Sequence, residues 1–225
     1  NGERISARVI VGCGGPHDPL RKKFWSEESL NIAVNFILID GEFEDRVDLY
    51  FGSTAPGGYA WMIPKRGGAN IGIGIQTRFS KGLSLNSMAE NFFRNFKGNV
   101  TYRGGGVLPM SGSIRNFTKG HYMLVGDSAG MVLPSNGAGI TTAMIGGRIA
   151  GQVIAKHIMD GTPLDEYQSH WNEQMGRVMK YSKRGIFWGG MMFRSPDWMV
   201  NAGFNKLTKP LIWRAITCRP VFGLF

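Results

Sequence analysis

The fold is decided by two neighbouring runs of sequence, Gly126-Asp127-Ser128-Ala129-Gly130 and Pro134-Ser135-Asn136-Gly137-Ala138-Gly139-Ile140. Residues 121–125, directly before them, have the β-branched and aromatic character of a short strand. Residues 140–158, directly after them, carry apolar or small side chains at three- and four-residue spacing, which predicts a helix. The predicted order is therefore a strand, an acidic turn, a loop rich in proline and glycine, and a helix.

This arrangement suits a ligand that carries hydroxyl groups and negative charge. An aspartate at the end of a strand can accept hydrogen bonds from sugar or ribityl hydroxyls, and glycines let the backbone approach a ligand closely. The first amides of a helix are unpaired and carry partial positive charge, so they favour a phosphate or the electron-rich edge of a reduced flavin. The alternative is a glycine-rich turn that binds nothing, but the complete string with its proline and spaced glycines favours a ligand.

The two runs are similar to the second FAD motif of flavoproteins with the p-hydroxybenzoate hydroxylase fold, and particularly of the geranylgeranyl reductase family. The resemblance implies that Asp127 touches the ribityl or pyrophosphate region of FAD. It also implies that the backbone of residues 134–140 lies near the pyrimidine edge of the flavin. The FAD-binding residues that follow from it are Gly126, Asp127, Pro134, Asn136, Gly137, Ala138, Gly139 and Ile140.

Two further segments resemble the same family in order and spacing. Residues 56–74 look like its Tyr-x-Trp-x-x-Pro stretch and the Ala-Asn-x-Gly-x-Gly strand that follows, and residues 105–109 look like its Gly-Gly-x-x-Pro return to the flavin domain. The resemblance covers about residues 5–155. By resemblance, an antiparallel sheet floors a substrate cavity against which the flavin ring lies, and Tyr59, Trp61 and Pro64 bind the substrate.

Tyr59 and Trp61 are the residues on which this cavity depends. Alternate strand residues share a face, so both rings can point into one pocket that suits a long apolar chain or a planar ring. The alternative is an aromatic pair in the core of the sheet. A Tyr59→Ala or Trp61→Ala variant that folds and turns over substrate normally would exclude the pocket.

The start of the chain departs from the family pattern. Residues 8–17 stand where the family has a strand followed by Ala-Asp-Gly-x-x-Ser, with Gly14 at the Asp position and Asp18 at the Ser position. The sequence therefore predicts that a flavin contact at this turn comes from the backbone rather than from a carboxylate.

Residues 1–50 contain no Gly-x-Gly-x-x-Gly turn that leads into a helix, as a dinucleotide-binding start requires. No helix-period apolar run follows the early glycines, because Pro16, Asp18 and Pro19 intervene. We therefore expect the C-terminal part of a longer protein, with the N-terminal part absent or supplied by a companion chain. We also expect weak FAD binding or none by these residues alone, and tight stoichiometric FAD after gel filtration would contradict that.

The predicted fold class is α+β: the end of a FAD-binding α/β domain, an antiparallel β-sheet substrate domain and a helical C-terminal cap. Strands are expected at 31–39, 45–52, 58–63 and 69–76, and an amphipathic helix at 84–96. Hairpin turns are expected at Asp40-Gly41 and Arg66-Gly67-Gly68. The expected boundaries are 1–25 for a first FAD-domain segment, 26–105 for the sheet domain, 106–160 for the FAD-domain return and 161–225 for the cap.

Composition excludes several classes of protein. The chain has 225 residues, 43% of them hydrophobic, and no apolar run long enough to span a membrane. No N-terminal segment resembles a signal peptide, so none is expected. Its two cysteines and four histidines form neither metal-ligand spacing nor a disulfide framework, so no metal is expected. We therefore expect a cytoplasmic location.

The net charge of +10 is concentrated at the C-terminus, where residues 171–225 hold nine basic and two acidic residues. The same segment contains four tryptophans and the run Met191-Met192-Phe193. Basic residues mixed with such side chains suit a peripheral contact with anionic lipid on the inner face of a membrane. The alternative is a helical cap whose aromatic side chains pack inward. Nucleic acid is not an expected partner, because no recognition motif accompanies the charge.

The resemblance implies a FAD-dependent oxidoreductase that reduces carbon–carbon double bonds of an isoprenoid, geranylgeranyl-type chain. The substrate is then an isoprenoid or lipid-like molecule, and the electron donor stays open. No side chain is an obvious general acid. Two alternatives stay open: a flavin-dependent monooxygenase or halogenase of the same fold, and a membrane-associated, non-catalytic half whose flavin-binding part lies elsewhere.

Overall fold

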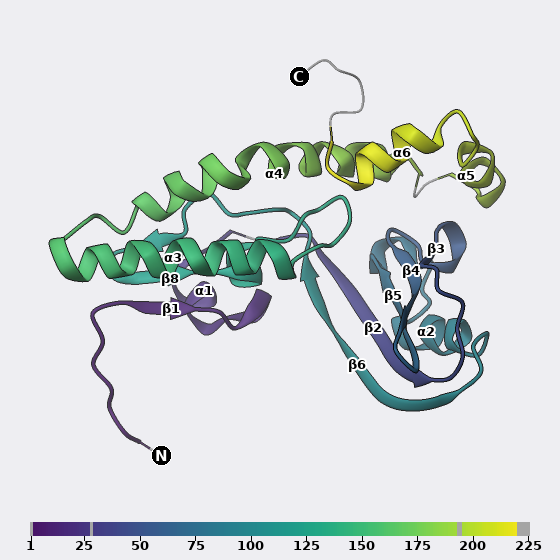
Figure 1. The fold of residues 1–225 in the computed structure, drawn as a ribbon, viewed down its shortest axis with the longest axis horizontal. Coiled ribbons are helices and arrows are strands. Elements are labelled where there is room, and N and C mark those ends of the chain that lie inside the picture. The colour runs from purple at the N-terminus through teal and green to yellow at the C-terminus, as the bar shows by residue number, and fades with distance from the viewer. Residues whose placement is uncertain (1, 28, 193–194, 220–225) are drawn as a thin grey trace. The chain divides into compact units, whose positions relative to one another are not determined.

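The computed structural model describes residues 2–27, 29–192 and 195–219, and it divides into two compact units (Figure 1). The first comprises residues 1–30, 109–185 and 214–225, and the second comprises residues 31–108 and 186–213. Phe193, Arg194 and residues 220–225 of the predicted cap lie outside the described residues, as do the side chains of 186–192 and 215–216. The mixed α and β composition confirms the predicted fold class.

The first unit is built on a small mixed sheet with the strand order β1-β8-β7. Strand β1 (Ile10–Gly12) runs parallel to β8 (Tyr122–Leu124), and β7 (Thr118–Lys119) pairs antiparallel with β8. The strand predicted before the acidic turn is therefore confirmed. Helix α1 (Pro19–Phe24) follows β1 although no helix was expected there, because Asp18 caps its N-terminus and Pro19 occupies its first turn.

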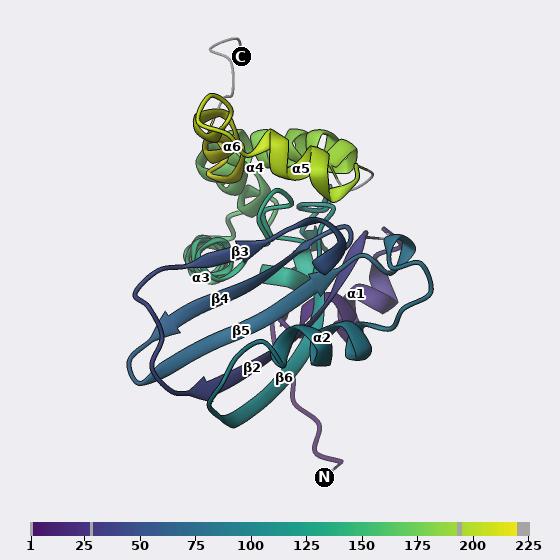
Figure 2. The same cartoon turned by 90° about the vertical axis from the view of Figure 1, so that its right-hand side faces the viewer.

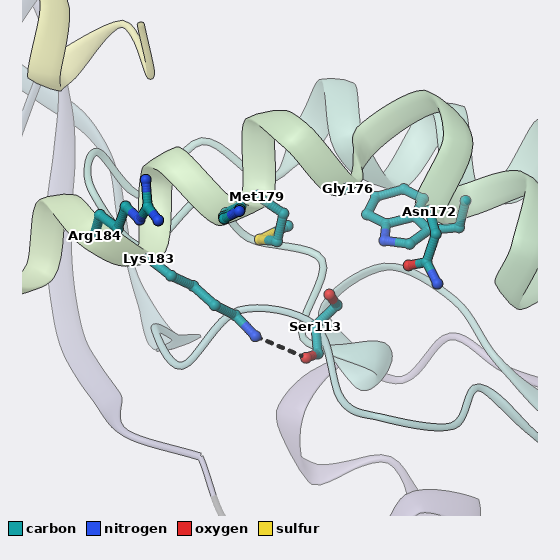
Figure 3. A pocket seen from close by; sticks show the side chains of 8 residues that line it. Ser113, Asn172, Gly176, Met179, Lys183 and Arg184 are labelled. Carbon is teal, nitrogen blue, oxygen red and sulfur yellow. Dashed lines mark hydrogen bonds between the residues drawn. The ribbon is translucent and has the colours of Figure 1, made fainter. Parts of the chain in front are cut away.

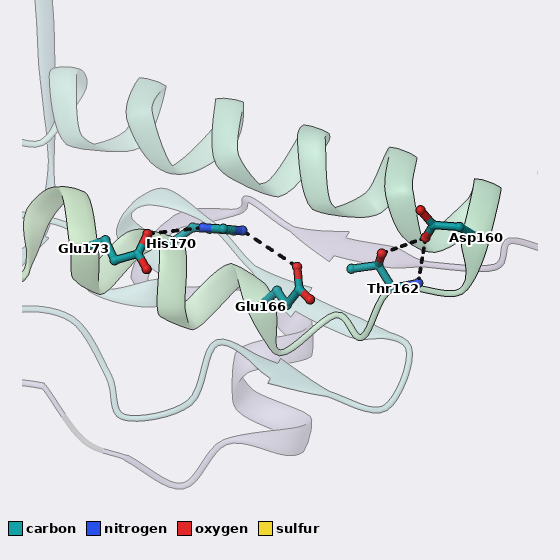
Figure 4. A network of polar contacts seen from close by, with 5 residues as sticks. All are labelled: Asp160, Thr162, Glu166, His170 and Glu173. Carbon is teal, nitrogen blue, oxygen red and sulfur yellow. Dashed lines mark hydrogen bonds and ion pairs between the residues drawn. The ribbon is translucent and has the colours of Figure 1, made fainter.

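Two long helices complete the first unit. Helix α3 (Ile140–Asp160) confirms the prediction over 140–158 and ends at Gly161, which adopts the left-handed conformation with φ of 80°. Asp160 accepts hydrogen bonds from the amide (3.0 Å) and hydroxyl (2.6 Å) of Thr162 in the connection to α4 (Glu166–Met192) (Figure 4). On α4, His170 lies 3.7 Å from Glu166 and 3.4 Å from Glu173.

The core of the first unit forms where α4 packs against the segment that leads to β8. The Phe117 ring lies 5.3 Å from the Tyr167 ring and 6.0 Å from the Trp171 ring, centroid to centroid. All three side chains are fully buried, together with Met123 and Leu124 of β8. Burial of each such side chain stabilises the fold by roughly 1.5–3 kcal/mol, so α4 is anchored directly behind the acidic turn.

The second unit is a five-stranded sheet with the order β3-β4-β5-β2-β6. The strands are β2 (Asn31–Asp40), β3 (Asp48–Tyr50), β4 (Tyr59–Lys65), β5 (Gly68–Ile75) and β6 (Asn99–Pro109). The hairpin predicted at Arg66-Gly67-Gly68 is confirmed, since Lys65 pairs with Gly68. The hairpin predicted at Asp40-Gly41 is wrong, because β2 lies between β5 and β6 while β3 pairs with β4. The Gly41 amide instead donates to the carbonyl of Gly67 at 3.2 Å, and the chain leaves the sheet there.

One face of this sheet is covered by α2 (Leu85–Phe93) (Figure 2). The Ser84 hydroxyl caps the helix by accepting the amide of Ser87 at 3.1 Å. The core beneath α2 consists of alternate residues of three strands packed against its aromatic face: Ile37, Ile39, Ala60, Met62, Ile71, Ile73, Phe92 and Phe93. The predicted helix over 84–96 is confirmed, although it begins one residue later and ends three residues earlier.

Two short helices, α5 (Asp197–Gly203) and α6 (Lys209–Ile216), follow α4. Asp197 at the start of α5 accepts hydrogen bonds from the amide (2.8 Å) and hydroxyl (2.5 Å) of Ser53. Trp198 and Trp213 are 70% and 62% exposed, whereas Trp171 is buried in the core. Of these three tryptophans of the predicted cap, Trp171 therefore packs inward and the other two face solvent. Over the described part of the chain, no helix has both the length and the apolar character needed to cross a membrane.

Candidate functional site

The acidic turn directly follows β8. Residues Gly126–Ala129 form one turn of 3-10 helix, and Gly130 ends it with φ of 69°. The Ser128 hydroxyl lies 2.6 Å from the carbonyl oxygen of Gly12 and 2.7 Å from that of Val125, and it is fully buried. The turn after β8 is therefore tied to the end of the neighbouring strand β1.

The turn after β1 is organised by the carboxylate of Asp18, which is only 3% exposed. It accepts the amides of Gly14 (2.7 Å), Leu20 (2.8 Å) and Arg21 (3.3 Å). The buried Arg21 guanidinium donates to the carbonyl of Ser128 at 2.7 Å, and burial lowers its pKa. The Gly14 amide is thus already engaged, at the position where the sequence predicts a backbone contact to a flavin.

Asp127 differs from Asp18 because its carboxylate accepts no hydrogen bond from any described residue. It is half-buried, and this burial raises the pKa of its carboxyl. A Cβ placed on Gly139 would lie 3.3 Å from Asp127 Oδ1, so the carboxylate stands beside the start of α3. A desolvated acceptor with no partner beside a helix start is the arrangement expected of a ligand-binding group.

The loop between the acidic turn and α3 is fixed by hydrogen bonds within the loop and by one hydrogen bond to α4. The Leu133 amide donates to the carbonyl of Ala138 at 2.9 Å, and the Asn136 side chain accepts the Ala138 amide at 2.9 Å. Ser135 is bonded through its amide to the hydroxyl of Ser182 on α4 at 3.0 Å. The loop therefore has a defined shape without a ligand.

The structure brings the predicted flavin residues together at one corner of the first unit, although they do not play the same part. Pro134 is buried and supports the loop, whereas Ala138 and Ile140 are exposed. Gly139 begins α3 without a side-chain cap, which leaves the first helical amides to another partner. An unpartnered carboxylate, an uncapped helix start and a glycine backbone fit the ribityl hydroxyls and anionic pyrimidine edge of FAD.

The second candidate region is the face of the five-stranded sheet opposite α2. The Tyr59 and Trp61 rings of β4 lie 5.8 Å apart, centroid to centroid. The Trp61 indole donates to Asn70 at 2.7 Å and lies across Gly72, where any Cβ would collide with the ring. The row continues from Tyr59 to Phe51 at 6.1 Å and from Phe51 to Phe204 at 5.4 Å. We call these four rings the aromatic row.

Pro64, the third predicted substrate residue, lies on the opposite face of β4 from the aromatic row. Ala60 and Met62 point into the core under α2, and Pro64 has their parity rather than that of Tyr59 and Trp61. The sequence analysis missed Asn70, Gly72, Phe51 and Phe204. Glycines at alternate positions of the strand over 68–75 were a usable signal, since they leave room for rings from the next strand.

Burial raises the pKa of Tyr59, so its hydroxyl stays protonated across the neutral range. Among the residues that the structure describes, no group of three or more histidine, cysteine, aspartate or glutamate side chains is placed to hold a metal ion. The two regions therefore offer hydrogen bonding at the acidic turn and aromatic surface at the sheet.

Comparison with known proteins agrees with this geometry. Residues 29–107 match the family model of the geranylgeranyl reductase catalytic domain. The chain is 31% identical over 235 residues to digeranylgeranylglycerophospholipid reductase 3 of Methanosphaera stadtmanae, covering 93% of this chain and 58% of that protein. It is 37% identical over 195 residues to digeranylgeranylglycerophospholipid reductase 2 of Methanothermobacter thermautotrophicus, covering 80% of this chain and 50% of that protein. The chain thus spans about half the length of the curated relatives it matches.

Solved structures give the fold. A geranylgeranyl bacteriochlorophyll reductase-like protein from Thermoplasma acidophilum superposes with a TM-score of 0.71 at 23% identity, over 96% of this chain and 56% of that one. A flavin-dependent halogenase from Brevundimonas superposes with a TM-score of 0.63 at 16% identity, over 100% of this chain and 51% of that one. The fold is that of the FAD-dependent oxidoreductases. Within that fold, the chain is similar to the geranylgeranyl reductase family, through residues 29–107 and through its relatives.

Proposed function

We propose that this protein takes part in the FAD-dependent reduction of carbon–carbon double bonds in the isoprenoid chains of a phospholipid. The observation that carries the proposal is the unpartnered, half-buried carboxylate of Asp127 beside the uncapped start of α3. Its support from relatives is the name digeranylgeranylglycerophospholipid reductase that they bear at 31–37% identity.

The residues have separate tasks in this proposal. Asp127 accepts hydroxyl hydrogen bonds of the bound cofactor, and the amides at the start of α3 face its electron-rich edge. The aromatic row binds the apolar chain through contact area, since an isolated alkene offers no charged handle. When bound in its reduced form, FAD supplies a hydride to the alkene, and a proton completes the new C–H bonds.

The experiment that tests the proposal uses the protein with a chemical reductant and a phospholipid with geranylgeranyl chains, under anaerobic conditions. FAD is added in large excess, because weak binding is expected of these residues alone. The expected product gains one H2 per reduced double bond, as measured by mass spectrometry. Asp127→Ala is expected to weaken FAD binding about tenfold or more, as loss of a charged hydrogen-bond partner does. Glu3→Ala removes an exposed carboxylate and serves as the control.

Titration of FAD fluorescence separates the two parts of the proposal. If FAD binds and Asp127→Ala binds it equally well, the assignment of Asp127 is wrong. If FAD binds but the phospholipid gains no hydrogen, the reductase function is wrong. Oxygen consumption coupled to insertion of oxygen or halogen into an aromatic compound would instead favour the monooxygenase or halogenase alternative.

Trp61→Ala tests the substrate part of the proposal. Loss of the ring opens the face above Gly72 and is expected to lower turnover of the phospholipid while FAD binding is retained. Leu83→Ala is the control, because Leu83 is 57% exposed and lies in the connection to α2, away from the face that carries Trp61. Normal turnover by a folded Trp61→Ala protein would exclude the row from the substrate site.

A further inference from the structure

A basic groove lies on the first unit, between α4 and the loop that contains Ser113. Its volume is about 450 Å³, within the range of small-ligand pockets. Lys180, Lys183 and Arg184 of α4 line it together with the apolar side chains of Met179 and Trp171 (Figure 3). Positions 176, 179, 180 and 183 of a helix fall on one face, so Met179, Lys180 and Lys183 share the same wall.

Two of the three cations there, Lys180 and Lys183, have no acidic partner among the residues that the structure describes. Like charges three and four residues apart destabilise a helix, yet α4 carries Lys180, Lys183 and Arg184 at this spacing. The preceding acid on α4 is Glu173, which pairs with His170. The charge of these two lysines is therefore available to an anionic ligand.

The loop opposite α4 gives the groove a fixed second wall. Gly112 has φ of 76°, and any Cβ there would collide with the Lys183 side chain, so glycine lets that chain lie against the loop. Lys183 donates to the carbonyl of Ser113 at 3.3 Å (Figure 3). A Cβ on Gly130 would lie 2.5 Å from the Gly112 carbonyl oxygen, so the same loop packs against the end of the acidic turn.

The floor of the groove contains an unpaired donor. The indole Nε1–H of Trp171 is buried and has no acceptor among the residues that the structure describes. Buried donors in proteins are nearly always paired. An acceptor oxygen that enters the groove beside Lys183 and Met179 would supply a partner.

We propose that this groove binds the phosphate of a phospholipid headgroup. Lysine and arginine recognise phosphate oxygens by charge-assisted hydrogen bonds. The methylene stems of the same lysines offer apolar contact to the glycerol and first acyl carbons. The proposal rests on the proposed function for its choice of a phospholipid. It gives a phospholipid a polar anchor on the unit that carries the acidic turn.

Calorimetric titration with three probes tests the proposal: dihexanoyl phosphatidic acid, dihexanoyl phosphatidylcholine and inorganic phosphate. Phosphatidic acid is expected to bind most tightly, since it joins an anionic phosphate to apolar carbons. The double variant Lys180→Gln/Lys183→Gln should weaken its binding about tenfold or more. The double variant Lys156→Gln/Arg177→Gln removes equal charge from exposed positions of α3 and α4 outside the groove, and should change the affinity less than about twofold.

A second readout locates the ligand. The indole N–H resonance of Trp171, assigned through its contact with the Phe117 ring, is expected to shift on saturation with phosphatidic acid. Equal weakening by both double variants, or an unshifted indole, would overturn the site. Binding of inorganic phosphate as tight as that of phosphatidic acid would overturn the lipid assignment. These probes are saturated and need no flavin, so failure of the reductase function leaves the result unaffected.

Discussion

Two aspartates follow the paired parallel strands β1 and β8, and the structure uses them in opposite ways. Asp18, after β1, is 3% exposed and accepts three backbone amides. Asp127, after β8, is half-buried and accepts none from the described residues, and its pKa is raised by burial. The Asp18 carboxylate stabilises the fold through these hydrogen bonds. Burial of the Asp127 carboxylate without such bonds is unfavourable for its charged form.

The difference between them is what separates a structural acid from a candidate binding acid. Position after a parallel strand is common to both, so position alone does not identify the ligand-binding residue. The hydrogen bonds that each carboxylate accepts do identify it. Burial of a carboxylate without hydrogen-bond donors is unfavourable unless a ligand supplies them.

Asp18→Ala is the substitution with the largest expected effect on stability. It leaves three buried or half-buried amides without an acceptor and removes the cap of α1. The expected loss in the free energy of unfolding is ~2–4 kcal/mol, measured by urea denaturation. Asp18→Asn retains one carbonyl oxygen for the cap and should lose roughly half as much. A loss below ~1 kcal/mol would mean that Asp18 is not the structural member of the pair.

Ser128→Ala tests the link between the two turns and has the next largest expected effect. The Ser128 hydroxyl is fully buried and joins the acidic turn to the carbonyl of Gly12. Its removal leaves a buried carbonyl with a weaker set of partners, so we expect a loss of ~1–2 kcal/mol in the same urea assay. Ser6→Ala, at an exposed position, is the control and should change nothing measurable. Equal stability of Ser128→Ala and Ser6→Ala would show that the turns are held together by packing alone.

The sequence was sufficient for elements with strong periodicity. The apolar spacing over 140–158 predicted α3, and the Arg66-Gly67 turn predicted the hairpin from β4 to β5. Helix α1 was missed because Asp18 and Pro19 were interpreted as interruptions, although an aspartate cap followed by proline is a helix start. The hairpin at Asp40-Gly41 failed because strand pairing is a tertiary choice that a turn permits but does not determine.

For the candidate sites, residue type was visible in the sequence but environment was not. The Gly-Asp run singled out Asp127, yet only the coordinates distinguish its empty hydrogen-bond sites from the filled ones of Asp18. The sequence likewise pointed to Tyr59 and Trp61, but not to Phe204, which joins the aromatic row from a residue far along the chain. Long-range neighbours of this kind follow from the packing of the fold and leave no local pattern.

Asp127→Asn has the smallest expected effect on stability. Whether it raises or lowers the stability tests the contrast between Asp18 and Asp127. Because burial raises the pKa of Asp127 in the folded chain, the folded state holds the proton more tightly than the unfolded state. The wild-type protein therefore loses stability as the pH rises from the ordinary carboxyl value of 3.8 through the raised pKa. Asparagine has no proton to lose, so the variant should be the more stable protein at neutral pH, by about 1–2 °C in Tm.

The pH dependence distinguishes this explanation from a simple improvement in packing. The Tm difference between Asp127→Asn and wild type should shrink as the pH is lowered and vanish below 3.8, where the wild-type carboxyl becomes protonated in both states. A difference that stays constant with pH would assign the gain to packing, and a less stable variant would mean that the carboxylate has a stabilising partner. Asp18→Asn should show the opposite sign at neutral pH, because there the substitution removes hydrogen bonds that the fold already uses. The two variants together therefore test whether the carboxylate after β8 is held at the expense of stability.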